Sequence, residues 1–406
     1  MAAIIPFRAL RPAPAAAACV AAVPYDVVSA DEARALAAGN ALSFLHVSRA
    51  EIDLAPDTNP YSDAVYARAA GNLATLKAQA PLLVEDTPSL YVYRLRMGDH
   101  VQTGVAGTFS IDEYDRNVIK RHERTHRDKE DDRTRHLIEL RAQTGPVFLT
   151  YRASRNVDAV VNRTTTRAPL FDLTAADGVQ HTIWRVDAGE VNDLVAAFGR
   201  IPSLYIADGH HRAASAARAR QQLRGSTRAA GEWDTVLAVA FPDNQMQILP
   251  YNRVVKDLGS HTPQSLLEKL REQFAVTPGP AVPVRRGQVA MFLDDRWHTI
   301  DLGAPPHGLE AADRLDVSRL QDAVLAPLVG IGDVRTDTRI DFIGGARGTA
   351  ELEKLVKSGK AAVAFSMYPV SVDDLMQIAD AGGIMPPKST WFEPKLRDGL
   401  LSHVIG

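Results

Sequence analysis

The stretch SLYIADGHHRAASAARARQQLRG, from Ser203 to Gly225, contains the pattern that decides the fold. A short apolar run leads into Asp208 and Gly209, and an alanine-rich run follows at once and ends at Gly225. Short apolar runs bounded by turn residues are typical of buried strands, and alanine-rich runs closed by glycine are typical of helices. The stretch therefore predicts a strand, a tight Asp-Gly turn and a helix, which is the repeating unit of α/β proteins.

Strands and helices also alternate along the rest of the chain. The stretch 89–111 predicts a hairpin that turns at Gly98-Asp99, and 288–302 predicts another that turns at Asp294-Asp295. Further strands are expected at 145–153, 181–187, 234–242, 247–255, 339–345 and 361–369, and helices at 31–40, 62–80, 188–200, 262–274, 317–330 and 349–359. This alternation predicts a mixed α/β (α+β) fold.

The length of 406 residues exceeds that of a typical single-core domain, so we expect more than one packed segment. We predict an N-terminal α/β region at 1–155, which contains a densely charged run. A region at 156–258 contains the Asp-Gly turn, and a C-terminal α/β region occupies 259–406.

Composition and charge limit the partners of the protein. A formal net charge of -3 provides no overall basic field, so we expect no nucleic-acid partner. The single cysteine, Cys19, excludes internal disulfides and cysteine-based zinc clusters. Prolines and arginines interrupt the alanine-rich N-terminus, and apolar stretches fall short of the ~18–20 residues that span a bilayer. We therefore expect a cytoplasmic protein that meets small-molecule substrates and no membrane; the sequence leaves its oligomeric state open.

The segment HERTH, from His122 to His126, matches the pattern H-E-x-x-H. On a helix this spacing places two imidazoles on one face, with Glu123 beside them to activate a zinc-bound water. The surrounding cations, among them Arg124, would repel a zinc ion. The competing interpretation is a solvated helix face with ion pairs four residues apart, Glu123 to Arg127 and Asp131 to Arg135.

A third interpretation of the charged run is a site for phosphate groups and a divalent ion. In it, Lys120, Arg121 and His122 neutralise charge in the transition state, and Glu123 accepts a proton from a hydroxyl. Asp26, in the segment PYDVVS, is the second candidate for the base. Asp26 and Glu123 are also the expected ligands of Mg2+, which prefers oxygen ligands.

The segment DGHHR, from Asp208 to Arg212, is the expected phosphate-binding element. Helix N-termini bind anions through unpaired N–H groups and partial positive charge. Gly209 lets the backbone approach a phosphate closely, and His210, His211 and Arg212 add donors. We expect Asp208 to cap and orient the turn.

Several motifs resemble known families. The segment YIADGHHRAASA resembles the ParB/sulfiredoxin-like superfamily, in which a comparable turn holds nucleotide phosphates and in which free-serine kinases carry a similar DGHxR turn. Nearly the whole chain resembles the conserved family called domain of unknown function 1015. That resemblance rests on PYDVVS, SFLHVSRAEIDL, RHERT with DDRTRH, DGHHR and MPPKSTWFEPKLRDGL. His126 is not typical of the family, so the zinc pattern is expected to be accidental.

The resemblance implies a ParB/sulfiredoxin-like nucleotide-binding core and phosphoryl transfer to a small hydroxylated metabolite such as free L-serine. The expected donor is ATP, ADP or pyrophosphate with Mg2+, and Lys388 is a further candidate contact to the donor phosphates. The second hypothesis is a nucleotide-binding regulatory protein of the ParB type that is non-catalytic or hydrolyses slowly. The third is a zinc hydrolase that uses His122, Glu123 and His126.

Overall fold

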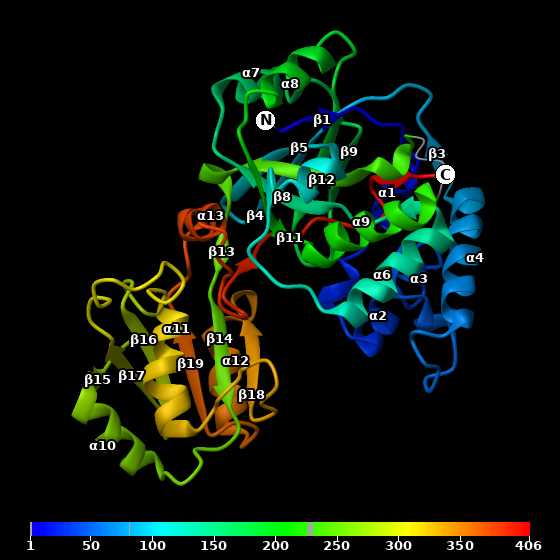
Figure 1. Cartoon of the computed structure of the whole chain (residues 1–406). Helices are drawn as coiled ribbons and strands as arrows, with labels where there is room; N and C mark the ends of the chain where they lie inside the picture. Colours follow the sequence, from blue (N-terminus) through cyan, green and yellow to red (C-terminus); the bar gives the residue numbers. More distant parts are fainter. Residues whose placement is uncertain (1, 81, 226–229) are drawn as a thin grey trace. The chain divides into compact units, whose positions relative to one another are not determined.

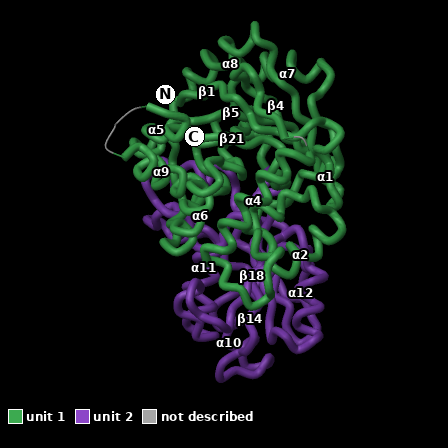
Figure 2. Tube along the Cα trace, turned by 90° about the vertical axis from the view of Figure 1, so that its right-hand side faces the viewer, with its two compact units in different colours: residues 1–246, 394–406 green, residues 247–393 purple. Residues whose placement is uncertain are grey.

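The computed structural model describes residues 2–80, 82–225 and 230–406. The chain forms two compact units, the first made of residues 1–246 and 394–406 and the second of 247–393 (Figure 2). The sequence analysis expects three segments, 1–155, 156–258 and 259–406, whereas the structure has two units. Strands from 1–155 and from 156–258 belong to one sheet, so both segments contribute to the first unit. Both units combine helices with sheets, which confirms the mixed α/β class.

The first unit is built on a nine-stranded mixed sheet (Figure 1). Its order is β6 (Ile119–Lys120), β11 (Leu204–Asp208), β8 (Val147–Tyr151), β12 (Thr235–Pro242), β5 (His100–Ser110), β4 (Tyr91–Met97), β10 (Gln180–Arg185) and β9 (Phe171–Thr174), with β1 (Ile4–Ile5) paired to β5. The pairs β6–β11 and β8–β12 are parallel, and the other pairs are antiparallel. Strands β4 and β5 form the hairpin expected at Gly98-Asp99.

Helices bury the apolar side chains of this sheet. Alternate residues of β12, Val236, Ala238 and Ala240, join the main hydrophobic core, as the two-residue period of a strand requires. The helices α7 (Arg155–Thr164) and α8 (Val191–Phe198) lie side by side, and α6 (Arg127–Leu140) packs on α9 (His210–Arg224) (Figure 1). All four helices contribute side chains to this core.

A second layer of the first unit brings the two ends of the chain together. Its sheet has the order β3 (Leu83–Val84), β2 (Ala9–Arg11), β21 (Ser402–Val404) and β7 (Ala142–Gln143). The helices α2 (Ala30–Ala37), α3 (Leu45–Ser48) and α4 (Asp63–Gln79) form a separate hydrophobic core beside it. Because β21 pairs with β2 and β7, the segment 394–406 is fixed within the first unit.

The second unit contains a six-stranded sheet whose pairs are all antiparallel. Its order is β15 (Ala275–Pro278), β17 (Arg296–Asp301), β16 (Gln288–Leu293), β19 (Val363–Met367), β14 (Tyr251–Val255) and β18 (Ile340–Gly344). Its helices are α10 (Pro263–Gln273), α11 (Asp316–Leu320), α12 (Gly348–Lys357) and α13 (Val372–Asp380). The hairpin expected at Asp294-Asp295 joins β16 and β17. The helix expected at 317–330 continues beyond α11 as a π-helix, Gln321–Val329.

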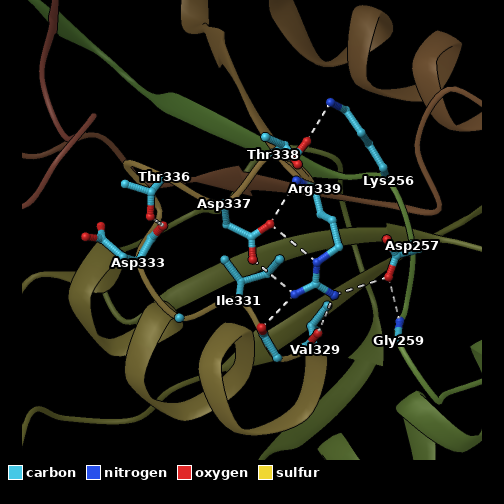
Figure 3. Close-up of polar contacts among 12 residues, drawn as sticks. Lys256, Asp257, Gly259, Val329, Ile331, Asp333, Thr336, Asp337, Thr338 and Arg339 are labelled. Carbon is cyan, nitrogen blue, oxygen red and sulfur yellow. Dashed lines mark hydrogen bonds and ion pairs between the residues drawn. The ribbon is translucent and has the colours of Figure 1, made fainter.

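Arg339 stabilises the end of that π-helix (Figure 3). Its guanidinium donates to the carbonyl oxygens of Val329 at 3.3 Å and Gly330 at 2.6 Å. The carboxylates of Asp337 and Asp257 accept from the same group at 3.0 and 3.3 Å. A cation that binds the last carbonyls of a helix satisfies acceptors that otherwise lack partners.

Among the described residues, none of the helices is both long enough and apolar enough to cross a membrane.

Two glycines of the first unit are expected to respond oppositely to alanine. A Cβ at Gly104 in β5 would lie 2.6 Å from the carbonyl oxygen of Ala240, whereas one at Gly71 in α4 would have no neighbour within 4 Å. We expect Gly104→Ala to destabilise the protein by about 1–3 kcal/mol through overpacking. Gly71→Ala should stabilise it by about 0.5–1 kcal/mol, because glycine is costly inside a helix. Thermal unfolding midpoints that shift in the same direction would contradict this packing.

Candidate functional site

The site is organised by the turn between β11 and α9. β11 ends at Asp208, Gly209 has φ +95°, and α9 begins at His210. The strand, turn and helix are therefore those that the sequence predicts. A Cβ at position 209 would lie 3.0 Å from Nε and 3.1 Å from Cζ of Arg212. Glycine is thus required both for the backbone conformation and for the close approach of this guanidinium.

The carboxylate of Asp208 binds two cations. Its Oδ2 accepts from Lys395 Nζ at 3.2 Å and from Arg212 Nη2 at 3.3 Å. Burial alone would raise the pKa of Asp208, but Lys395 and Arg212 outweigh it and hold the pKa well below its usual range. Asp208 was expected to cap α9; instead Gly209 is the N-cap residue, and the Asp208 side chain holds the two cations in place.

Arg212 connects several segments of the first unit. Its guanidinium also donates to the Pro146 carbonyl and lies 3.7 Å from Oδ2 of Asp26. The side chain is 8% exposed, and its Nε has no hydrogen-bond partner. Asp26, in the short 3-10 helix Tyr25–Val27, is 35% exposed. The turn therefore combines two carboxylates and two cations from three distant parts of the sequence.

The HERTH segment is not helical, so the zinc-helix interpretation is wrong in its geometry. β6 ends at Lys120, α6 begins at Arg127, and His126 is the N-cap residue of α6. His126 stacks on His211 with ring centroids 6.0 Å apart, and its backbone N–H donates to His211 Nε2 at 3.0 Å. Since the residues between β6 and α6 form neither helix nor strand, His122 and His126 do not share a helix face.

His122 instead meets His210. Their ring centroids are 4.4 Å apart at an interplanar angle of 84°, and both side chains are buried. The Oε2 atom of Glu123 lies 3.7 Å from His210 Nδ1. Burial lowers the pKa of His122 to about 4, against opposing effects of Asp208 and the Ile206 carbonyl. Burial and the neighbouring His122 likewise lower the pKa of His210 well below its ordinary value, so both rings are neutral at pH 7.

Other residues expected at the site have different neighbours. The Lys120 ammonium lies 5.9 Å from the centre of the Tyr205 ring, and the Arg121 guanidinium lies 4.8 Å from that of Tyr114. Lys388 belongs to the second unit, where its ammonium lies 5.6 Å from the centre of the Tyr251 ring. Asp131 and Arg135 were expected to pair with each other within α6. In the structure each pairs with another helix, Asp131 with Arg218 of α9 and Arg135 with Asp63 of α4.

A small cavity of about 50 Å³ adjoins Arg212 within the first unit. It is lined by Tyr25, Ser48, Arg133, His136, Leu137, Ala142, Gln143, Thr144, Gly145, Val147, Arg212, Ser215, Val236 and Asp398. Arg133 lies 4.2 Å from the centre of the Tyr25 ring and pairs with Asp132 at 2.7 Å. The hydroxyl of Ser48 is buried without a hydrogen-bond partner.

Asp398 is the carboxylate that lines this cavity, and it is 2% exposed. Burial raises its pKa to about 7, although Arg212 opposes the shift. Neither Asp398 nor Lys395 was expected from the sequence. The C-terminal segment that contains both was noted there only for its family resemblance and for Lys388.

The comparison with protein families identifies the chain. The family described as "Protein of unknown function (DUF1015)" matches residues 4–318, so the chain belongs to this family. No curated protein sequence matches the chain.

Several solved structures are similar to the chain. Free serine kinase in complex with AMP is 14% identical over 74% of this chain and 91% of its own, with a TM-score of 0.37. A conserved hypothetical protein from Pyrococcus furiosus is 14% identical over 73% and 94%, with a TM-score of 0.35. SbnI with a C-terminal truncation, from Staphylococcus aureus, is 12% identical over 72% and 85%, with a TM-score of 0.38. The function proposed below therefore rests on the chain's own residues.

The raised pKa of Asp398 predicts a pH-dependent contribution to stability. An unfolded aspartate titrates near 3.8, so folding takes up a proton between about pH 4 and 7. This contribution to the free energy of unfolding decreases as the pH rises through that window and is lost above about pH 7. In the variant Asp398→Asn, the side chain at this position has no ionisable group. Its melting temperature relative to the natural protein should therefore be higher at pH 8 than at pH 5, by at least about 2 °C. A difference that is constant between pH 5 and 8 would contradict the shift.

Proposed function

We propose that this member of the DUF1015 family is a phosphotransferase. It would move a phosphoryl group from a nucleotide or pyrophosphate to a small hydroxylated metabolite, with free L-serine as the first acceptor to test. The observation that carries the proposal is the position of Arg212. This residue belongs to the glycine turn at the start of α9 and also lines the cavity, so an anion at the turn and a molecule in the cavity would be neighbours.

The donor phosphates would bind at the turn. α9 has 15 residues, and the N-terminus of such a helix favours anions through its N–H groups and dipole. Lys395 and Arg212 add positive charge there, and Asp208 fixes the two cations before a ligand arrives. Preorganised cations stabilise the charge of a transferring phosphoryl group without reorganisation during the reaction. Mg2+ would enter with the donor, and partly exposed Asp26 is the carboxylate expected to reach it.

The acceptor would occupy the cavity. Its volume of about 50 Å³ exceeds the ~10–15 Å³ that one water molecule needs, so it suits only a small acceptor. Arg133, whose side chain is 14% exposed, offers a cation for an acceptor carboxylate, and Ser48 offers a hydroxyl without a hydrogen-bond partner. Asp398, with a pKa of about 7, has the proton affinity expected of a general base near neutral pH. We assign it this role ahead of Glu123 and Asp26 because it lines the cavity itself.

The test is phosphorus NMR of the purified protein with Mg2+ and ATP, ADP or pyrophosphate, each with and without L-serine. A new phosphomonoester signal that requires the acceptor would support the proposal and identify the donor. Lys395→Gln should reduce the rate of transfer by about 10²–10³-fold, the usual effect of losing one charge-stabilising donor. Arg218→Gln is the matched control, because Arg218 pairs with Glu130 and Asp131 instead of with the turn and should retain transfer.

Two outcomes would contradict the proposal. A donor that stays intact with every small alcohol offered would favour the nucleotide-binding regulatory function instead. A donor hydrolysed at the same rate with and without acceptor would exclude the cavity as an acceptor site.

A further inference from the structure

The His122 ring packs edge-on against the His210 ring, but its two nitrogen atoms are buried without a hydrogen-bond partner. The residue is 1% exposed, and neither ring nitrogen forms a hydrogen bond of normal geometry. Buried polar side chains are nearly always paired, and an orphaned one calls for an explanation such as an ion. Neutral imidazole is also the side chain that most often binds transition metals.

The side chains around His122 complete a set of metal ligands. One ligand atom from each of His122, Glu123 and His210 lies within 4.8 Å of the other two. We propose that these three residues bind a divalent first-row transition metal such as Zn2+. Two imidazoles and one carboxylate form a known protein set for these ions, with further positions left for water or substrate. In a tetrahedral zinc site the ligand atoms lie about 3.3 Å apart, since each bond is about 2.0–2.1 Å long. Glu123 is 54% exposed and can move to close the set.

The ligand chemistry separates this ion from Mg2+. Magnesium prefers oxygen ligands and dehydrates reluctantly, whereas two of the three ligands here are nitrogen atoms. Two cations of the turn, Arg212 and Lys395, are paired with the carboxylate of Asp208, which reduces their repulsion of a metal ion.

The position of the ion defines its role. His210 is the first residue of α9, directly after the phosphate-binding turn, so open coordination positions would lie beside the donor phosphates. This role rests on the proposed function, but the binding of the metal does not. The sequence pattern and the structure also assign different metal ligands, and the difference can be tested. The H-E-x-x-H pattern pairs His122 with His126, whereas the structure brings His122 together with His210.

The test is a titration of the metal-free, full-length protein with Zn2+ by calorimetry, and with Co2+ by visible absorption, without nucleotide. We expect one equivalent to bind and the melting temperature to rise with metal. Glu123→Gln, at an exposed position, and His210→Gln should each weaken binding by more than the 10–100-fold typical of an outer-shell partner. His126→Gln is the matched control and should bind as the natural protein does.

Equal loss in His126→Gln and His210→Gln, or no binding in the natural protein, would overturn the proposal. Binding unchanged in Glu123→Gln would overturn it as well, and this variant answers the question even if His210→Gln fails to fold. Because no donor or acceptor is present in the titration, its outcome is independent of the phosphotransferase test.

Discussion

The carboxylate of Asp208 is the constraint on which the site depends. The Asp208 side chain is 28% exposed, and a partly buried charge of this kind is stabilised by cations held close to it. The partners here are Arg212, in the first turn of α9, and Lys395, from the C-terminal segment. The same interaction therefore fixes the turn, orients the first residues of α9 and joins the returning C-terminal segment to the main sheet.

Arg212 extends this constraint to the cavity. Its guanidinium contacts Asp208, Asp26 and the Pro146 carbonyl, and it also lines the space that contains Asp398. The opposite pKa shifts of Asp208 and Asp398 follow from their surroundings. Asp208 meets two cations directly, whereas burial dominates for Asp398 despite Arg212. The two carboxylates near the Arg212 guanidinium therefore have different pKa values. Asp208 keeps its negative charge, whereas Asp398 can exchange a proton near neutral pH.

The charged HERTH segment shows how local spacing can mislead. Its two histidines suit a helical zinc motif, yet the residues between β6 and α6 are not helical. Each histidine finds a partner in the DGHHR turn instead, His122 with His210 and His126 with His211. The parallel pairing of β6 with β11 causes this match, because it brings the ends of the two strands to the same edge of the sheet.

The sequence by itself determined the local structure and the family resemblance. Apolar periodicity and glycine positions located the two hairpins, several of the helices and the strand, turn and helix around Gly209, because such elements depend on neighbouring residues. It also identified Asp26, His122, Glu123 and the DGHHR turn as candidates. Only the tertiary structure decided that His210, not His126, joins His122, that Lys395 binds Asp208, and that Asp398 lines a cavity. These contacts join residues 88 to 187 positions apart, and only strand pairing and the return of the C-terminal segment bring such residues together.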